Sequence, residues 1–343
     1  MKKQNSTASE SWIELHLHLD GAITPEIAKK LAILQNIELP TQNACELQNL
    51  LQVPANCQNL NDFLQCFALP LTLLQTKIGI SEAVFLVASA LQQQQVIYAE
   101  LRFAPQLHTQ KGLSQEEIVL SALEGVKRSP IPLNLILCCM RGENTHNANL
   151  ETLRLAKKYL VAHGGVVALD LAGAEGLYPT MAYQDIFAQA KQMQIPFTIH
   201  AGEAAGADSV ATALSFGAKR IGHGVRSFEN PAVLKQLQQS QVALEMCPTS
   251  NRQTNAIHNM QQYPLLSYLN QGICVTLNTD DMAICGITLA DEFCYMQENF
   301  GLTDGQKLRL LQNAANAAFT DEATKRYLHQ TLQASVYKGY KQD

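Results

Sequence analysis

The sequence has no long hydrophobic run. Its longest apolar stretches, residues 83–91 and 166–172, are far shorter than the roughly 20 residues that a membrane-spanning helix requires. Residues 1–11 carry two lysines and then turn polar, without the apolar segment of a secretory signal. We therefore expect a cytoplasmic protein that has no membrane partner.

The sequence also lacks an excess of basic charge. It has 25 Lys and Arg residues against 30 Asp and Glu residues, which gives a formal net charge of −5. Proteins that neutralise a phosphate backbone usually carry the opposite balance. We expect no nucleic-acid partner.

No two cysteines have the CxxC spacing, although nine cysteines are present. The spacing therefore predicts neither a disulfide framework nor a structural zinc cluster. Most of the thiols lie in apolar stretches, as Cys274 does, and we interpret them as small buried hydrophobic residues.

The chain does contain a regular alternation of strand-like and helix-like patterns. Of its 343 residues, 47% are hydrophobic and 16% are charged, which is the balance of a folded protein. Alternating patterns of this kind are typical of a parallel sheet covered by helices. The eight strand candidates are residues 12–18, 96–103, 133–140, 166–171, 197–200, 220–222, 242–246 and 274–278.

Helical patterns separate these strands. Thr24 is the expected N-cap of the first helix, which runs to about Gln35, and Ser114 with Glu117 has the spacing of a capping box. A further helical segment begins at about Thr288. The other helical patterns cover residues 114–127, 150–163, 183–193, 208–216, 231–238 and 264–271.

Eight alternating strands over this length predict an α/β fold, a (β/α)8 TIM-type barrel with extra helices after the first strand and at the C-terminus. We expect a single domain over residues 1–343. An open doubly wound sheet is the structural alternative. The glycine-rich fingerprint that usually accompanies dinucleotide binding in such sheets is missing, because Gly222-His-Gly224 lacks a third glycine.

Four potential metal ligands lie at the carboxyl ends of predicted strands, where a barrel assembles its active site. His16 and His18 are one residue apart on the first strand, so both project to the same side. His200 ends the fifth strand candidate, and Asp280 follows the eighth. Imidazole nitrogens and a carboxylate oxygen suit Zn²⁺ or a similar divalent ion. We predict one Zn²⁺ per chain, with a water molecule completing its coordination shell.

Further polar residues occur at the same strand ends. Glu203 lies three residues beyond His200, His223 follows the sixth strand, and Asp281 is adjacent to Asp280. Because a bound metal generates hydroxide at neutral pH, these residues are candidates for the acid, the base and the substrate anchor of a hydrolytic reaction.

Five segments that carry these residues resemble, in order, the motifs of the adenosine deaminase family. They are ELHLHLDGA (14–22), HAGE (200–203), GHG (222–224), CPTSN (247–251) and LNTDD (277–281). The resemblance implies a zinc-dependent (β/α)8 barrel that hydrolyses the 6-amino group of a purine. Its implied activity is conversion of adenosine, and of 2′-deoxyadenosine, to inosine or deoxyinosine and ammonia. The alternative within the family is a deaminase of free adenine or of a modified adenosine.

The resemblance also implies a role for each site residue. His16, His18, His200 and Asp280 would bind zinc. Glu203 would protonate purine N1, while His223 would orient the attacking water and help to deprotonate it. For a small-molecule purine nucleoside, the implied binding residues are Asp20 for the 5′-hydroxyl, the backbone N–H of Gly173 for N3, and Asp281 for N7.

Two positions depart from the family pattern. Ala174 stands where an acidic residue is common, and Met282 stands where proline is common. These differences bear on loop shape and substrate fit, because the implied metal and acid–base residues are all present.

Some residues have a functional and a structural interpretation. Leu60, Phe63, Phe67 and Leu71 share one helical face and would form either a lid or, as their pattern favours, ordinary core. Arg102 is interpreted as structural, paired with a barrel carboxylate. Ser250 is a candidate contact behind the metal site. Five further histidines are expected to be solvated or to cap helices: His108, His146, His163, His258 and His329.

Two rival classes remain. Hydrolases that use two metals bridged by a modified lysine share this barrel, but residues 166–173 contain no lysine. A binding protein that has lost activity would usually lack a ligand or the acid, and both are present here.

Overall fold

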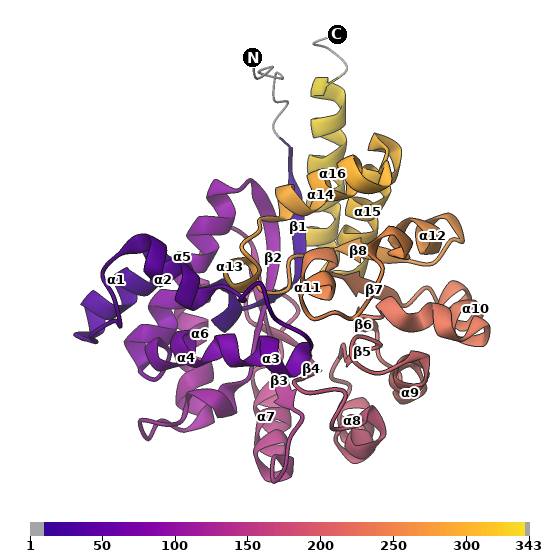
Figure 1. Ribbon diagram of the computed structural model, residues 1–343. Helices are drawn as coiled ribbons and strands as arrows, with labels where there is room; N and C mark the ends of the chain where they lie inside the picture. Colours follow the sequence, from indigo (N-terminus) through magenta and orange to yellow (C-terminus); the bar gives the residue numbers. More distant parts are fainter. Residues whose placement is uncertain (1–9, 340–343) are drawn as a thin grey trace.

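A computed structural model describes residues 10–339 of the protein. The strands lie at the centre of Figure 1 and the helices surround them. Three strands match the predicted bounds, and five differ by one to three residues at an end. The strands are β1 (Trp12–His18), β2 (Val96–Phe103), β3 (Leu133–Met140), β4 (Val166–Ala172), β5 (His200–Ala201), β6 (Arg220–His223), β7 (Ala243–Met246) and β8 (Val275–Leu277).

The strands form two parallel four-stranded halves, β1–β4 and β5–β8, in sequential order. Single bridges join the halves at both seams, Leu169 with Phe197 and Leu17 with Asp280. At the second seam the His18 N–H donates to the Asp280 carbonyl at 2.8 Å, and the Asp280 N–H donates to the His16 carbonyl at 2.8 Å. The predicted (β/α)8 barrel is therefore confirmed.

Helices cover the outside of the barrel, with five helices between β1 and β2 and three after Thr288, as predicted. The α-helices are α1 (Pro25–Gln35), α2 (Ala44–Leu51), α3 (Leu60–Phe63), α4 (Ala68–Leu73), α5 (Lys77–Gln93), α6 (Gln115–Lys127), α7 (His146–Lys158), α8 (Gln184–Gln192), α9 (Ala207–Phe216), α10 (Pro231–Ser240), α11 (Pro248–Gln253), α12 (Leu265–Asn270), α13 (Met282–Cys285), α14 (Leu289–Phe300), α15 (Asp304–Ala317) and α16 (Glu322–Gly339). Short 3-10 helices are η1 (Asp20–Ala22), η2 (Leu64–Phe67), η3 (Pro105–His108), η4 (Thr180–Tyr183), η5 (Val225–Glu229) and η6 (Met260–Gln262).

Capping residues predicted where helices begin more accurately than hydrophobic periodicity predicted where they end. Thr24 caps α1, and Ser114 with Glu117 forms the predicted capping box of α6. The predicted helix 150–163 is wrong at both ends, because α7 covers His146–Lys158. The chain cannot stay helical there, since the Val161 N–H donates to the Val166 carbonyl. Residues 159–165 therefore form the connection that leads into β4.

The fifth strand differs most from its prediction. The β5 ladder is only His200–Ala201, so His200 begins it rather than ending it. The preceding residues still approach β4, because the Thr198 N–H donates to the Leu169 carbonyl at 3.0 Å. His200 and Ala201 pair instead with Gly222 and His223 of β6.

Buried charges as well as apolar side chains fill the barrel interior. Arg102 lies 3.1 Å from Asp170 and 2.9 Å from Glu245, and Arg220 pairs with Glu100 at 2.6 Å and with Glu245 at 2.5 Å. All five side chains are at most 1% exposed. The interpretation of Arg102 as structural and paired with a barrel carboxylate is confirmed. We call these five residues the interior ion network.

The remaining histidines and cysteines only partly follow their predictions. His146, His163 and His258 are exposed as expected, and the carbonyl of Leu74, the C-cap residue of α4, is capped by His108. Its ring is fully buried in η3, beside Phe103, and Nδ1 lies 3.0 Å from the Leu74 carbonyl oxygen. Four cysteines are buried and Cys57, Cys66 and Cys274 are partly buried. Cys45 and Cys294 are exposed, which contradicts the burial prediction for these two.

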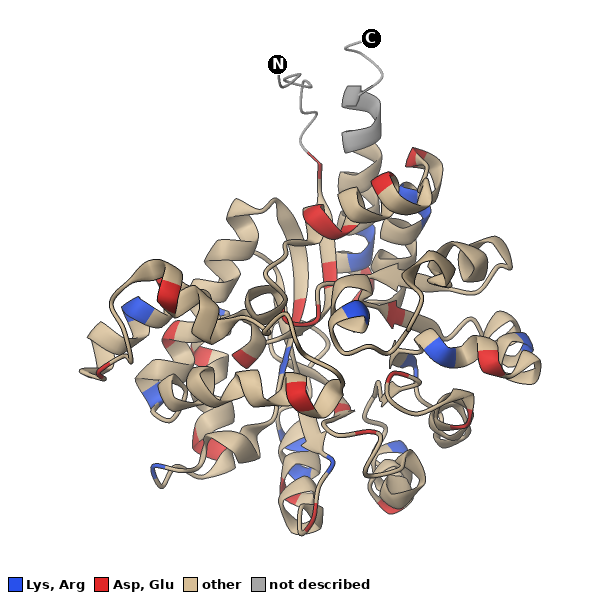
Figure 2. Cartoon of the chain, in the orientation of Figure 1, with Lys and Arg blue, Asp and Glu red and all other residues tan. Residues whose placement is uncertain are grey.

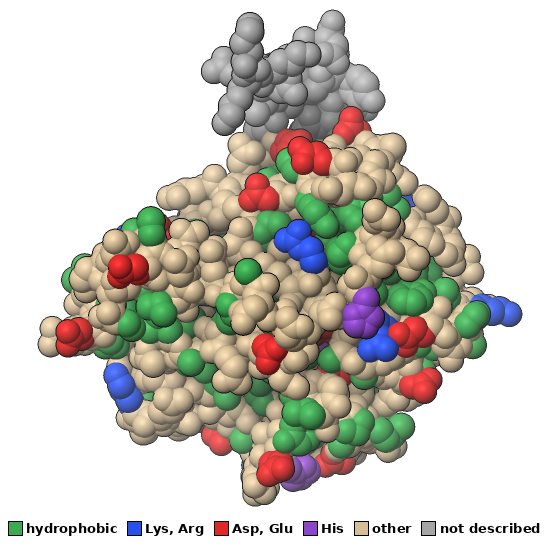
Figure 3. Space-filling model, viewed as in Figure 1, with side chains coloured by type: hydrophobic (Ala, Val, Ile, Leu, Met, Phe, Trp, Pro, Cys, Tyr) green, Lys and Arg blue, Asp and Glu red, His purple; other side chains and the backbone are tan. Residues whose placement is uncertain are grey.

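Charged residues are spread over the outer helices (Figure 2), and the face in Figure 3 mixes side chains of both charges with apolar side chains. Within residues 10–339, no single helix is long and apolar enough to span a bilayer. The segments Leu60–Leu73 and Lys77–Gln93 meet the length and composition criteria only as a pair, with a bend of 116° between them.

Candidate active site

Four side chains from three parts of the barrel converge at the carboxyl ends of the strands. One ligand atom from each of His16, His18, His200 and Asp280 lies within 4.8 Å of the other three. His16 Nε2 is 3.0 Å from Asp280 Oδ1, and His18 Nε2 is 3.1 Å from His200 Nε2. The structure thus brings together the four predicted ligands, which we call the histidine–aspartate cluster.

Carboxylates behind the cluster fix which nitrogen faces inward in two of its three rings. His16 Nδ1 lies 2.7 Å from Glu245, and His200 Nδ1 lies 3.0 Å from Asp170. A neutral ring that donates through Nδ1 presents a lone pair at Nε2. The lone pair of His16 Nε2 therefore faces an Asp280 oxygen, and within residues 10–339 this buried nitrogen has no hydrogen-bond partner. A cation between these atoms removes the repulsion, so the donor set fits a divalent metal ion.

Glu203 is a buried carboxyl group beside the cluster. It is 3% exposed, and its Oε2 lies 3.5 Å from His223 Nε2. Burial raises the pKa of Glu203 to about 8, and the charges of Asp280 and Glu175 add to this increase. The side chain is therefore largely neutral at pH 7 and can donate a proton.

Glu175 holds the segment that carries Glu203. Its buried carboxylate accepts hydrogen bonds from four consecutive backbone N–H groups, those of residues 202–205, at 2.7 to 3.0 Å. The Ser209 hydroxyl also donates to it, at 2.6 Å. One carboxylate thus fixes the backbone on both sides of Glu203. Glu175 directly follows Ala174, the position where the family pattern has an acidic residue. The sequence analysis gave Glu175 no role.

His223 faces both Glu203 and the cluster. Its Nε2 is 3.8 Å from Asp280 Oδ2, and the Asn251 amide donates to Nδ1 at 3.1 Å. The other end of Asn251 accepts a hydrogen bond from Tyr263 at 2.9 Å, which fixes the amide orientation. Burial lowers the pKa of His223 well below 6.5, so the ring is neutral and carries its proton on Nε2.

The backbone is strained where two of these side chains are attached. Asp280 has a φ of 65° and His223 a φ of 59°, in the left-handed region that residues with a Cβ rarely adopt. Neighbouring strand bonds hold both residues in place, since the Asp280 N–H and carbonyl both bond to β1. Strain that the surroundings enforce in this way often occurs at functional sites.

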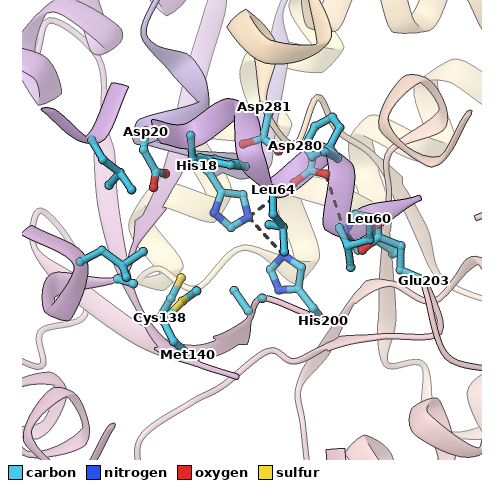
Figure 4. Close-up of a pocket in the computed structure, with 18 residues that line it drawn as sticks. His18, Asp20, Leu60, Leu64, Cys138, Met140, His200, Glu203, Asp280 and Asp281 are labelled. Carbon is cyan, nitrogen blue, oxygen red and sulfur yellow. Dashed lines mark hydrogen bonds and ion pairs between the residues drawn. The ribbon is translucent and has the colours of Figure 1, made fainter. Parts of the chain in front are cut away.

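A pocket of about 200 Å³ opens over the cluster (Figure 4). His18, His200, Glu203 and Asp280 lie at its base. Its outer wall is apolar and comes from α3, η2 and α4: Leu60, Phe63, Leu64, Phe67 and Leu71. The expectation of core packing for Leu60, Phe63, Phe67 and Leu71 is therefore only partly right: all four line the pocket, while Phe63 also belongs to a small core cluster with Ile284 and Cys285, against which Phe67 packs. Helical spacing alone does not distinguish a pocket wall from a packed core.

The three predicted substrate-binding residues also line this pocket. Asp20 and Asp281 are buried, and among the residues that the structure describes each has a carboxylate oxygen without a hydrogen-bond partner. Burial raises the pKa of Asp20 to about 6, and burial with the charges of Asp280 and Asp20 raises the pKa of Asp281 well above 3.8. Gly173 has a φ of 98°, a conformation that favours glycine. Buried polar atoms without partners are costly unless a ligand satisfies them.

Sequence reasoning missed the residues that support the site from behind. For Asp170 and Glu245, the only sign of a role in the sequence was the position of an acidic residue inside an apolar strand. Asn251 lies in a quoted motif but received no role. Ser250 is buried, and its Oγ has no hydrogen-bond partner among the described residues.

Comparison with known proteins agrees with this geometry. The family model described as adenosine deaminase matches residues 12–335. A curated adenosine deaminase from Haemophilus ducreyi is 47% identical over 322 residues, which are 92% of this chain and 94% of that protein. A second, from Enterococcus faecalis, is 38% identical over 93% of this chain and 95% of that protein.

Solved structures share the same barrel. An adenine deaminase from Arthrobacter aurescens superposes with a TM-score of 0.85 and 26% identity, covering 95% of this chain and 98% of that one. An Arabidopsis N6-mAMP deaminase gives 0.81 at 24% identity, covering 95% and 98%, a likeness that concerns the fold alone. With a matched family model, curated relatives at 47% and 38% identity, and a site where family motifs meet, the chain belongs to the adenosine deaminase family.

Proposed function

We propose that this protein hydrolyses adenosine and 2′-deoxyadenosine at purine C6, releasing ammonia. The observation that carries the proposal is a neutral buried acid, Glu203, in the same pocket as the histidine–aspartate cluster. The curated relatives named adenosine deaminase, at 47% and 38% identity, support the choice of substrate.

We propose Zn²⁺, one per chain, as the ion held by His16, His18, His200 and Asp280. Three imidazoles and one carboxylate without a thiolate suit zinc at a catalytic site. When bound, the metal supplies a water acidic enough to act as a nucleophile at neutral pH.

Glu203 is proposed to donate a proton to purine N1. Attack at C6 breaks the aromaticity of the ring and places negative charge on N1, so a proton must arrive there as the bond forms. An ionised carboxylate could not provide it, and the raised pKa of Glu203 keeps the proton available at neutral pH.

His223 is proposed to orient the attacking water. Asn251 donates to Nδ1, so the Nε2–H points toward the space between Glu203 and Asp280. From this position the ring donates a hydrogen bond to the water oxygen. This bond aims a lone pair of the water oxygen at C6. Helping to deprotonate the water would require the other tautomer of the ring.

The remaining polar groups are proposed to bind the nucleoside. Asp281, whose raised pKa favours the protonated form, can donate to N7. The Gly173 N–H is available for N3. Asp20, with a pKa of about 6, is mostly ionised at pH 7 and can accept a hydrogen bond from the 5′-hydroxyl.

Free adenine is the second candidate substrate, because the Arthrobacter protein of the same fold is an adenine deaminase. The higher identity to adenosine deaminases and the unpaired oxygen of Asp20 favour the nucleoside. Adenine would leave that carboxylate buried and unsatisfied.

A side-by-side assay tests the proposal. The purified protein is given adenosine, 2′-deoxyadenosine, adenine and AMP, and the loss of the 6-amino group is followed by absorbance. We expect the highest kcat/KM for the two nucleosides. A higher kcat/KM for adenine or AMP would contradict the substrate assignment, and no deamination of any of the four would contradict the function.

A further inference from the structure

A second cavity lies against Glu203. Its volume is about 530 Å³, and both Leu60 and Glu203 line it as well as the substrate pocket. In Figure 4, Leu60 and Glu203 lie together at the end of the substrate pocket that is farther from Asp20. The acid therefore faces two cavities at once.

The two cavities differ in chemistry. The substrate pocket has the apolar wall formed by α3, η2 and α4, and a bound nucleoside would occupy it. The second cavity is lined largely by polar side chains, of which Asn255, His258, Asn259 and Gln262 are exposed. A polar cavity of this size, open at its rim, has room for several hydrogen-bonded water molecules.

Thr254 connects Glu203 with the second cavity. This residue is 5% exposed and lines that cavity, and its Oγ1 lies 3.1 Å from Glu203 Oε1. The same Oγ1 is also 3.1 Å from the Ser250 carbonyl oxygen. A hydroxyl has one hydrogen, so it donates to one of these acceptors at a time. An ionised Glu203 attracts that hydrogen more strongly than a carbonyl does, whereas a neutral Glu203 leaves it to Ser250.

The proposed deamination, on which this inference rests, requires Glu203 to be protonated again after each turnover. Water gives its oxygen to C6 and has two hydrogens to distribute. One completes the departing ammonia, and the other leaves to solvent as the water is activated. The product keeps the proton that Glu203 gave to N1, so the carboxylate is left without one. Until a proton returns, the carboxylate cannot start the next cycle.

We propose that the proton returns to Glu203 from the second cavity through the hydroxyl of Thr254. A hydronium ion in that cavity gives a proton to Thr254 Oγ1 while Oγ1 gives its own proton to Glu203 Oε1, so the hydroxyl ends unchanged and a neutral water remains. Glu203 is thereby protonated again by solvent, from the side that faces away from the product. Thr254 is thus a relay and positioning residue that does not touch the substrate.

Paired substitutions separate the hydroxyl from the shape of the side chain. Thr254→Val keeps the branched shape and removes the hydroxyl, whereas Thr254→Ser keeps the hydroxyl. With adenosine, we expect Thr254→Val to lower kcat at least about 10-fold with little change in KM, and Thr254→Ser to retain most of the wild-type kcat. Thr152→Val is the matched control, because its buried hydroxyl also donates to the carbonyl four residues earlier, in α7 and away from the site.

Rapid mixing distinguishes a relay from a structural role. Enzyme prepared with Glu203 protonated should complete its first turnover in Thr254→Val at a rate within about 2-fold of wild type. Later turnovers should be slow, which gives a burst of one product per site. An equal loss in the first and later turnovers, or an unchanged kcat, would overturn the relay.

A second variant covers the case in which Thr254→Val does not fold. Ala256 also lines the second cavity, and Ala256→Phe fills part of it while leaving Thr254 in place. The relay predicts the same burst followed by slow turnover, and wild-type kinetics in this variant would contradict it. Wild-type enzyme without deaminase activity would instead overturn the proposed function, so the two failures are distinguishable.

Discussion

Two sets of buried charged side chains lie one above the other in this barrel, and they are built differently. In the interior ion network each charged group faces one of opposite sign, as Arg102 does between Asp170 and Glu245. In the histidine–aspartate cluster, nitrogen atoms of three imidazoles and a carboxylate oxygen converge, with His16 Nε2 3.0 Å from Asp280 and His18 Nε2 3.1 Å from His200 Nε2. In the first set every charged group has a partner of opposite charge, and the second brings together four ligand atoms that could hold a cation.

This difference between the two sets indicates how the protein holds the histidine–aspartate cluster in place. Asp170 and Glu245 belong to the network and also hold the rings of His200 and His16. The network thus pre-organises the cluster, so little rearrangement accompanies metal binding. The predictions below separate the two sets, beginning with the largest effect.

Removing a ligand should affect the cluster alone. His200→Ala takes away one of four donors, and we expect loss of both the metal and the deaminase activity. Metal content per chain and kcat are the measurements. His146→Ala, which changes an exposed histidine, is the control and should leave both unchanged. Undiminished metal in His200→Ala would refute the ligand assignment.

Removing the acid should leave the cluster intact. Glu203→Gln keeps the size and the acceptor oxygen of the side chain but cannot protonate N1. We expect a normal metal content and a kcat about 10² to 10⁴-fold lower. If kcat stays near the wild-type value, another group is the proton donor.

Breaking the interior ion network should cost stability. Arg102→Met removes the buried positive charge that Asp170 and Glu245 share, and we expect a loss of about 3–5 kcal/mol in the free energy of unfolding by urea. Lys127→Met is the control, because its partner Glu124 is in an exposed pair worth at most about 1 kcal/mol. Equal stability losses in the two variants would contradict a structural role for the network.

Asp20 should affect selectivity more than rate. Asp20→Ala removes the proposed partner of the 5′-hydroxyl, a charge-assisted hydrogen bond worth about 1.5–3 kcal/mol. We expect kcat/KM for adenosine to fall about 10 to 150-fold while kcat/KM for adenine changes little. A parallel fall for both substrates would show that Asp20 does not recognise the ribose.

Glu292 offers a smaller test away from the cluster. It is fully buried, accepts the Thr249 N–H at 2.9 Å, and burial raises its pKa to about 8 from 4.5. Because the folded pKa is the higher one, its contribution to stability is complete below about pH 4.5 and is lost as the pH rises through 8. The difference in the free energy of unfolding between Glu292→Gln and wild type should therefore shift in favour of Glu292→Gln as the pH rises from 5 to 8.5. A constant difference across this range would contradict the raised pKa.

The sequence predicted the parts of the structure that have local causes. The alternation within Trp12–His18 placed His16 and His18 on one side, and Ser114 with Glu117 marked the start of α6. The bounds of β5 were wrong because its pairing depends on two neighbouring strands. Long-range pairing of this kind leaves no periodic signal.

The candidate site shows the same limit. Its inner residues lie in motifs, so the sequence placed them together. The carboxylates of Asp170 and Glu245 come from strands far apart in the chain, and only the closed barrel brings them behind the histidines. The apolar wall was taken for core because a side chain that lines a pocket and one that fills a core share the same helical spacing.

The most direct test of the central claim is to locate the metal in crystals of the wild-type protein. Anomalous diffraction is collected on both sides of the zinc absorption edge, together with elemental analysis of the same sample. The account predicts one zinc per chain, between the side chains of His16, His18, His200 and Asp280. Two metals per chain, or an anomalous peak elsewhere with none at the cluster, would contradict it.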